Sequence, residues 1–412
     1  MVRTVWLMLA CGVLIVLVSG GLRQSFGIFL APVADGLAIG RETYGLVIAL
    51  QALIYGLAQP VVGLLADRFG ARVIIAIGAG VYALGLFGSA LSESSLQLTL
   101  SLGLLVGLGL SGATQVVVLG AVGKLVPNKN RGMVFGTIIA STSLGMFFLV
   151  PLIQLLLSEI GWRQTFFVMA ALLAFIPFLG LGLRCSRTQS DAPSGPTTTI
   201  RAAINEARHH QGYVLLTAGF FVCGFHVTFV GTHFPAFLTD NGVHPNIAAY
   251  GLGLIGLCNV AGAYLFGLLG DRFSKKNLLT GIYAGRAVIM ALILVVPINN
   301  VTALLFGAAL GFLWLATVPL TSGIVAQVFG TQYFSMLFGV VFMSHQLGSF
   351  AGAWLGGLIH DQTGNYDMMW MACIGFGVLA ALLHWPIEEQ PLCPEPAPGR
   401  QTCARTGART DG

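Results

Sequence analysis

Long apolar stretches alternate with short polar segments along the whole chain. About 20 consecutive apolar residues suffice for a helix to cross a bilayer, and a helix satisfies its backbone hydrogen bonds internally. The pattern therefore predicts an all-α membrane protein with twelve transmembrane helices, at residues 5–33, 43–66, 73–92, 96–123, 132–157, 164–184, 212–239, 247–270, 278–297, 301–326, 334–359 and 366–387.

A polar segment rich in proline, serine and threonine divides the predicted helices into two sets of six. It has the composition of a flexible linker, and the end of the chain has that of a disordered tail. We expect an N-terminal six-helix bundle over residues 1–184, a cytoplasmic linker over 185–211, a C-terminal six-helix bundle over 212–387 and a cytoplasmic tail over 388–412.

Composition agrees with a chain surrounded by lipid. Of the 412 residues 56% are hydrophobic and 8% are charged, whereas soluble domains carry about 25% charged residues. The seven cysteines show no Cys-x-x-Cys or Cys–His spacing, so neither a disulfide framework nor a metal site is expected. The start of the chain has the pattern of a signal peptide, but its apolar stretch continues past Arg23 to Pro32, and cleavage would leave an odd number of spans.

Basic residues are concentrated in loops on one side of the predicted membrane. With the N-terminus inside, every lysine and arginine lies inside except Arg41 and Arg163, in outer loops, and Arg23 and Arg286, within spans. Cytoplasmic loops are enriched in these residues, so we expect both termini in the cytoplasm and the chain in a bacterial inner membrane. The basic residues form short clusters rather than a stripe with interleaved aromatics, which argues against nucleic-acid binding.

One acid–base motif occurs in both halves, as GLLADRFGAR at residues 63–72 and GLLGDRFSKK at 267–276. Each copy lies between the second and third span of its half, so the halves are predicted to be parallel repeats about an axis along the membrane normal. Acids at helix ends with basic partners can form ion pairs that close a cytoplasmic gate; alternatively, they anchor the loops to lipid headgroups. These loop residues are Asp67, Arg68, Arg72, Asp271, Arg272 and Lys276.

The repeated motif resembles the loop signature of the major facilitator superfamily, and the resemblance covers all the predicted spans and the linker. It implies two pseudo-symmetric bundles that rock about a midplane site, with the loop residues holding the cytoplasmic gate shut. RQSFGIFLAPV, GLAQPVVGLLADRFG and GLLGDR, in spans one, two and eight, are most similar to bacterial relatives of the monocarboxylate transporters and oxalate–formate exchangers. That similarity implies a small organic anion as substrate.

Two departures from related branches qualify this resemblance. The acid and arginine that animal monocarboxylate transporters hold in span eight fall at Asn259 and Ala263, so that proton-coupled pair is absent. Drug–proton antiporters usually carry an arginine in span four and a Gly-Pro-x-x-Gly-Gly turn in span five. Here Gly103 stands at the first position and span five has the sequence ASTSLGMFFLVP, which disfavours efflux.

Two arginines lie within predicted spans, where charge is costly and marks a functional hypothesis. No aspartate or glutamate lies in mid-span. A guanidinium matches a carboxylate bidentately, and we predict that Arg23 binds an anionic substrate; the alternative is a gate or packing residue bonded to helix carbonyls. Span nine is usually peripheral in the superfamily, so we expect Arg286 to be structural and to brace Asp271.

Other polar side chains give weaker candidates. His226 and His233 lie seven residues apart on one face of span seven, either as proton-coupling residues that line a cavity or as hydrogen-bonding residues between helices. The further substrate-binding candidates are His233, Trp314, Thr317, His345 and Gln346.

Together these observations predict a monomeric secondary transporter of a small organic anion, working by proton symport or anion exchange. Efflux of an apolar or cationic compound is the alternative, and a transporter-like sensor is a further one. No nucleophile–base set or phosphate-binding loop is present in the sequence, so we expect neither an enzyme nor a cofactor.

Overall fold

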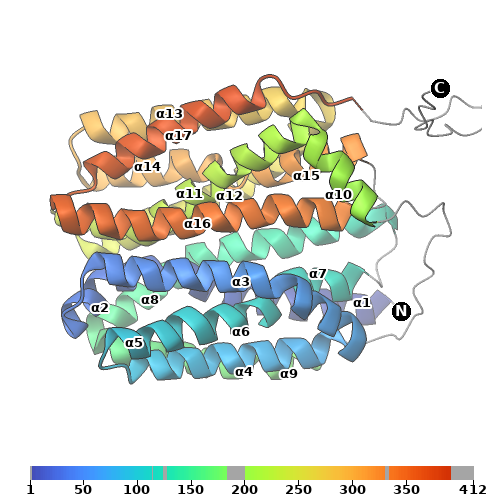
Figure 1. The fold of residues 1–412 in the computed structure, drawn as a ribbon. Helices are drawn as coiled ribbons and strands as arrows, with labels where there is room; N and C mark the ends of the chain where they lie inside the picture. Colours follow the sequence, from blue (N-terminus) through green and yellow to red (C-terminus); the bar gives the residue numbers. More distant parts are fainter. Residues whose placement is uncertain (1, 114, 124–127, 183–199, 330–333, 391–412) are drawn as a thin grey trace, which may run out of the picture.

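Two groups of long helices lie side by side in the computed structural model (Figure 1). The structure describes the chain except residues 1, 114, 124–127, 183–199, 330–333 and 391–412. Its described residues form helices and connecting turns, with no β-strand among them. The first group comes from the N-terminal half of the chain and the second from the C-terminal half (Figure 1).

The N-terminal half consists of α1 (Val2–Gln24), the 3-10 helix η1 (Phe26–Phe29), α2 (Leu30–Leu37), α3 (Arg41–Phe69), α4 (Ala71–Ala90), α5 (Ser95–Leu98), the π-helix η2 (Thr99–Leu105), α6 (Val106–Ala113), α7 (Gln115–Gly123), α8 (Asn128–Ala174) and α9 (Ile176–Gly180). The C-terminal half consists of α10 (Ile200–His209), α11 (Gln211–Asp240), α12 (Pro245–Arg272), α13 (Lys275–Val295), α14 (Asn300–Phe312), α15 (Thr317–Phe329), α16 (Phe334–Thr363) and α17 (Asp367–His384).

The predicted fold class is confirmed. Ten stretches of the described residues are long and apolar enough to cross a membrane. One of them, residues 136–180, covers most of the fifth and sixth predicted spans, which are separated where Gly161 takes a φ of +79°. The eleventh predicted span is the 30-residue helix α16.

Three elements differ from the sequence-based expectation. The first span is interrupted at Ser25, directly before η1, and the tenth is broken between Phe312 and Thr317. The predicted linker contains α10 in its second part, while its first part lies outside the described residues.

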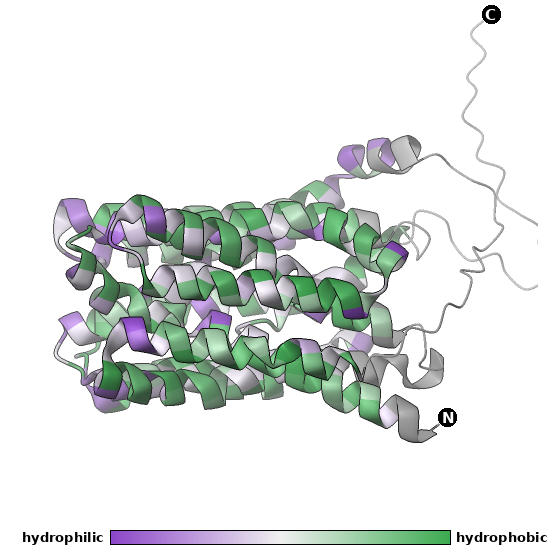
Figure 2. Ribbon diagram, turned by 90° about the horizontal axis from the view of Figure 1, so that it is seen from below, coloured by the Kyte–Doolittle hydropathy of each residue, from purple (hydrophilic) through white to green (hydrophobic). Residues whose placement is uncertain are grey.

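The helices are hydrophobic along most of their length, whereas hydrophilic residues gather toward the ends (Figure 2). Large apolar side chains are exposed on several helices, for example Leu64 on α3, Leu305 on α14 and Leu382 on α17. Water would penalise such a surface and lipid would not. The chain is therefore a multi-pass membrane protein.

The two ends of the molecule differ in which connections they carry. The helix α1 begins and α17 ends at the same end, which we call the terminal end (Figure 1). The opposite end, which we call the distal end, carries the connections from α2 to α3 and from α16 to α17 (Figure 1). The helices α3 and α16 approach each other at the distal end, and α3 turns away toward the terminal end (Figure 1).

Glycines allow helices to pack with their backbones in contact, as is common in membranes. A Cβ atom on Gly21 of α1 would lie 2.7 Å from the carbonyl carbon of Gly145 on α8. No heavy atom lies within 4 Å of the corresponding position on Gly80 of α4, which is exposed. The first glycine is therefore required for packing and the second is not.

We expect Gly21→Ala to destabilise the protein by roughly 1–3 kcal/mol, because the added methyl group overpacks the contact between α1 and α8. Gly80→Ala is the matched control and should leave stability unchanged or slightly raised, because alanine is the better helix former. The melting temperatures of the detergent-purified variants measure the difference. Equal melting temperatures would show that the contact is not tight.

Candidate functional site

Arg23 lies in the last turn of α1 and is half-buried. Its guanidinium carbon lies 5.0 Å from the ring centroid of Tyr55 on α3. In the part of the chain that the structure describes, no hydrogen bond or ion pair engages Arg23. The N–H donors of its guanidinium are therefore available for an anion. An anion would also offset the cost of placing a charge within a span.

A second donor accompanies Arg23. The hydroxyl group of Tyr82 on α4 is buried, lacks a hydrogen-bond partner among the described residues and lies within electrostatic reach of Arg23. A guanidinium and a phenol can both donate hydrogen bonds to a carboxylate. The sequence analysis did not select Tyr82. The only indication in the sequence was a polar hydroxyl group among the apolar residues of the third predicted span.

Aromatic rings connect Arg23 to the C-terminal half. The ring of Tyr55 lies edge-on to that of Phe342 on α16, with centroids 6.5 Å apart. Phe342 stacks on His345 at 5.7 Å with an interplanar angle of 4°. Arg23 and the half-buried His345 thus lie on either side of two aromatic rings at the interface between the bundles.

The polar partners of His345 belong to its own helix or to α11. Its Nδ1 atom lies 3.2 Å from Oε1 of Gln346 and 3.4 Å from the hydroxyl oxygen of Ser349. The imidazole also interacts with the thiol of Cys223. Gln346 itself is buried, and its Nε2 donates to the carbonyl oxygen of Ala52 on α3 at 3.1 Å. Gln346 therefore joins the two bundles.

The break between α14 and α15 frees backbone groups that other helices satisfy. Arg286, which is 1% exposed, donates to the carbonyl oxygens of Leu313, at 2.8 Å from Nη2, and Trp314. The amide N–H of Leu315 donates to Oδ1 of Asn259 at 2.8 Å, and Nδ2 of Asn259 donates to Ser143 on α8 at 2.8 Å. Arg286 thus stabilises this break. It makes no contact with Asp271 among the described residues, although the sequence led us to expect one.

Trp314 lies within this break and Thr317 directly follows it, and both are buried within the C-terminal bundle. The hydroxyl group of Thr317 lies 3.2 Å from the sulfur of Cys223. The indole N–H of Trp314 has no hydrogen-bond partner among the described residues. The break precedes Pro319, and Arg286 and Asn259 stabilise the freed backbone groups of residues 313–315.

His226 and His233 are fully buried between helices. Nε2 of His226 donates to the carbonyl oxygen of Cys373 on α17 at 2.8 Å. Nε2 of His233 donates to the carbonyl oxygen of Ala353 on α16 at 2.8 Å, and its Nδ1 lies 3.2 Å from the hydroxyl group of Tyr366. Both histidines therefore form hydrogen bonds between helices, which was the alternative to a role in proton coupling. The sequence indicated which face of the helix they share, but not which helix packs against that face.

Among the loop residues whose side chains the structure describes, no ion pair joins the two halves. Arg68 stacks over Phe69 with a centroid distance of 5.3 Å, and the backbone N–H of Lys276 donates to the carboxylate of Glu389. The side chain of Asp67 lies outside the described residues. The remaining loop residues are exposed and form no described ion pair, namely Arg72, Asp271 and Arg272.

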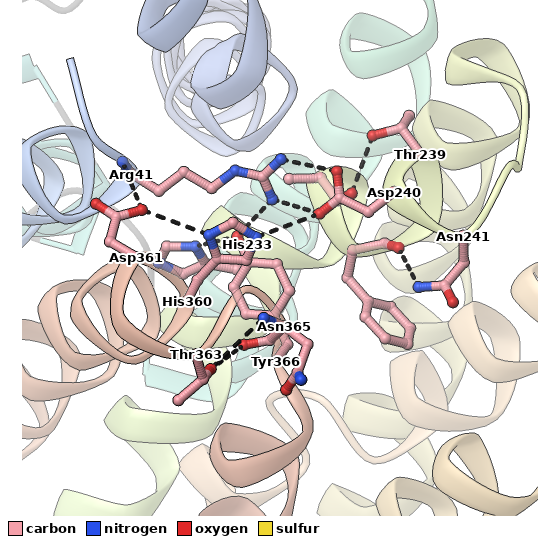
Figure 3. A network of polar contacts seen from close by, with 12 residues as sticks. Arg41, His233, Thr239, Asp240, Asn241, His360, Asp361, Thr363, Asn365 and Tyr366 are labelled. Carbon is pink, nitrogen blue, oxygen red and sulfur yellow. Dashed lines mark hydrogen bonds and ion pairs between the residues drawn. The ribbon is translucent and has the colours of Figure 1, made fainter.

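The two bundles are joined instead at the distal end, by residues that sequence reasoning did not select (Figure 3). The guanidinium of Arg41 on α3 binds both carboxylate oxygens of Asp240 on α11, at 2.5 and 2.7 Å. The carboxylate of Asp361 on α16 accepts from the backbone N–H groups of Arg41 and Glu42, at 3.1 and 2.8 Å. We call Arg41, Glu42, Asp240, Trp354 and Asp361 the distal network.

Several interactions stabilise the distal network. A bidentate arginine–carboxylate pair is among the stronger polar contacts, and a carboxylate at the start of a helix is favoured by the helix dipole. The indole N–H of Trp354 donates to Oε1 of Glu42 at 3.1 Å. A Cβ on Gly45 would lie 2.4 Å from the carbonyl oxygen of Ala353, so the bundles also touch through their backbones.

Apolar helices in two bundles with tight contact at one end, and an Arg23 that lacks an anionic partner among the described residues, are features of a membrane transporter and not of an enzyme. The family model of the Major Facilitator Superfamily matches residues 12–314 and 216–408, and the chain belongs to this family.

Comparisons with individual proteins agree. The chain is 24% identical over 397 residues to the uncharacterized MFS-type transporter YcxA of Bacillus subtilis (strain 168), covering 92% of this chain and 94% of that protein. It is 25% identical over 378 residues to monocarboxylate transporter 13 of Rattus norvegicus, covering 89% and 86%. The crystal structure of a D-xylose-proton symporter superposes with a TM-score of 0.71 at 17% identity, covering 95% of this chain and 100% of that one.

We expect Arg286→Met to lower the melting temperature by several degrees, because it leaves buried carbonyl groups without donors, at roughly 1–3 kcal/mol for each group. Arg272→Met, at an exposed position on α12, is the matched control and should melt like the unchanged protein. The detergent-purified variants can be compared by thermal unfolding. Similar melting of both variants would show that Arg286 does not stabilise the break.

Proposed function

We propose that this protein transports a small organic anion with a carboxylate group across a bacterial inner membrane by alternating access. The observation that carries the proposal is Arg23, a cation within a span that lacks an anionic partner among the described residues. A carboxylate would supply that partner bidentately, and the hydroxyl group of Tyr82 would add a donor.

The relatives support the chemical class of the substrate. Several similar proteins are monocarboxylate transporters, among them monocarboxylate transporter 13 of Rattus norvegicus. Because Arg23 has no anionic partner among the described residues, it also disfavours a cationic cargo, since like charges repel. Efflux of an apolar or cationic compound is thus the weaker hypothesis.

His345 is the proposed contact from the C-terminal bundle, because it is half-buried and connected to Arg23 through Tyr55 and Phe342. We assign supporting roles around the site to the remaining candidates, which are buried: His233, Trp314, Thr317 and Gln346. The coupling mode is either proton symport or anion exchange, and the protein works as a monomer.

The distal network is the proposed external gate in its closed state, with the distal end outside and the termini in the cytoplasm. The contacts of Arg41 and Asp361 hold α3 against α11 and α16 at this end. Toward the terminal end α3 turns away from α16 (Figure 1). In the alternate state the loop residues near Asp67 and Asp271 close the cytoplasmic side.

We expect Arg23→Gln to abolish uptake and to weaken carboxylate binding about 10- to 100-fold, the size of a lost charge-assisted hydrogen bond. Thermal stabilisation of the purified protein by a panel of small mono- and dicarboxylates, aromatic acids and lipophilic cations measures binding, because a ligand of the folded state raises stability.

Arg163→Gln is the matched control for this experiment. Arg163 also stacks on an aromatic ring, 4.3 Å from the centroid of Trp162, but it lies at the distal end and donates to the carbonyl oxygen of Ala90. It should retain binding. Stabilisation by cations or neutral compounds alone would overturn the organic-anion proposal.

We expect Asp240→Asn to open the distal end more often, because the ion pair with Arg41 is lost. A cysteine introduced at Ile48 reports this opening. Ile48 is 6% exposed and lies on the face of α3 that carries Gly45 and Ala52, which contact α16. Its labelling in cells by a membrane-impermeant maleimide should rise on the order of threefold to tenfold.

Asp35→Asn is the matched control, because Asp35 is an exposed acid on α2 at the same end. It should leave the labelling of the cysteine at Ile48 unchanged. An equal rate in the Asp240→Asn and Asp35→Asn variants would show that the distal network is not a gate.

A further inference from the structure

A histidine lies directly beside the distal network (Figure 3). His360 is in the last turn of α16, and its side chain is 17% exposed. Its Nε2 atom lies 3.7 Å from Oδ2 of Asp240, and its Nδ1 atom lies 3.4 Å from Oδ1 of Asp361. The imidazole is thus placed between the two carboxylates that bind α3.

The same two oxygen atoms bind the N-terminal half. Oδ2 of Asp240 accepts from Nη1 of Arg41, and Oδ1 of Asp361 accepts from the backbone N–H of Arg41. A protonated imidazole and α3 therefore compete for these oxygens. Two adjacent cations on one carboxylate also repel each other, since both carry a full positive charge.

Four elements surround His360, and their charged and titratable groups decide the sign of the effect. The ring of Tyr366, before α17, lies 4.7 Å from that of His360, and its hydroxyl accepts from Nη1 of Arg41 at 3.1 Å. The groups facing the site are Arg41 and Glu42 on α3, His233 and Asp240 on α11, Asp361 on α16, and Tyr366 with the neighbouring Asp367 at the start of α17.

When the distal end is closed, Arg41 and the positive end of the α3 dipole already compensate Asp240 and Asp361. When it is open, both carboxylates lose these partners while His360 stays beside them, because all three belong to the C-terminal half. The imidazole therefore binds its second proton more tightly in the open state. By linkage, a proton favours that state.

We propose that His360 is a proton-binding site that opens the external gate when the outside becomes acidic. Histidine is the side chain whose charge ordinarily changes between pH 5 and 8. The proposal rests on the assignment of the distal network as the gate of an alternating-access transporter. It adds a control on that gate and is independent of which anion is carried.

The test uses the cysteine at Ile48 and a membrane-impermeant maleimide at external pH 7.5 and 5.5. Rates are divided by those of Leu96→Cys, an exposed residue of α5 at the same end, which corrects for the pH dependence of the reagent. We expect the normalised rate to rise on the order of threefold to tenfold at the lower pH. In His360→Asn it should stay at the low value at both pH values.

Two further variants sharpen the test. His360→Lys carries a permanent charge and should label rapidly at both pH values. His244→Asn is the matched control: His244 is an exposed histidine that caps α12 at the same end, and this variant should keep the full pH dependence.

A pH dependence that persists in His360→Asn would overturn the proposal, as would slow labelling of His360→Lys at both pH values. Failure of the underlying gate gives a different result. In that case Asp240→Asn also leaves the labelling of the cysteine at Ile48 unchanged, whichever residue stands at position 360.

Discussion

Polar groups within a bilayer must find their partners in the protein, because lipid offers no hydrogen bonds. The break in the tenth span meets this requirement, since Arg286 and Asn259 bind the backbone groups that it frees. Arg23 does not meet it among the described residues. Both arginines lie within predicted spans, but among the described residues Arg286 is engaged by carbonyl oxygens, whereas Arg23 has donors left for an anion.

The spans and their division into two bundles were predictable from the sequence because hydropathy is a local property of each segment. The roles of polar side chains depend instead on neighbours that the sequence does not specify. His226 and His233 share a helical face as predicted, yet one bonds α17 and the other α16. The position of Arg23 in the first span was predictable, but the proximity of Tyr82 depends on how α4 is placed relative to α1 within the N-terminal bundle.

The distal network illustrates what local patterns cannot contain. Arg41 and Asp240 are 199 residues apart, and the backbone of Arg41 meets a carboxylate 320 residues away. Each residue alone has the pattern of an ordinary loop charge. Arg41 differs from most other basic residues because it is one of two in the predicted outer loops. That position does not indicate which residue it pairs with.

The amide group of Asn259 has a mechanical consequence. It holds Ser143 of the N-terminal bundle with its nitrogen and the backbone of Leu315 with its oxygen. Sliding of α8 along α12 therefore transmits force to the junction of α14 and α15 through one short side chain. A displacement between the bundles must therefore either break one of these two hydrogen bonds or move the junction of α14 and α15 with it.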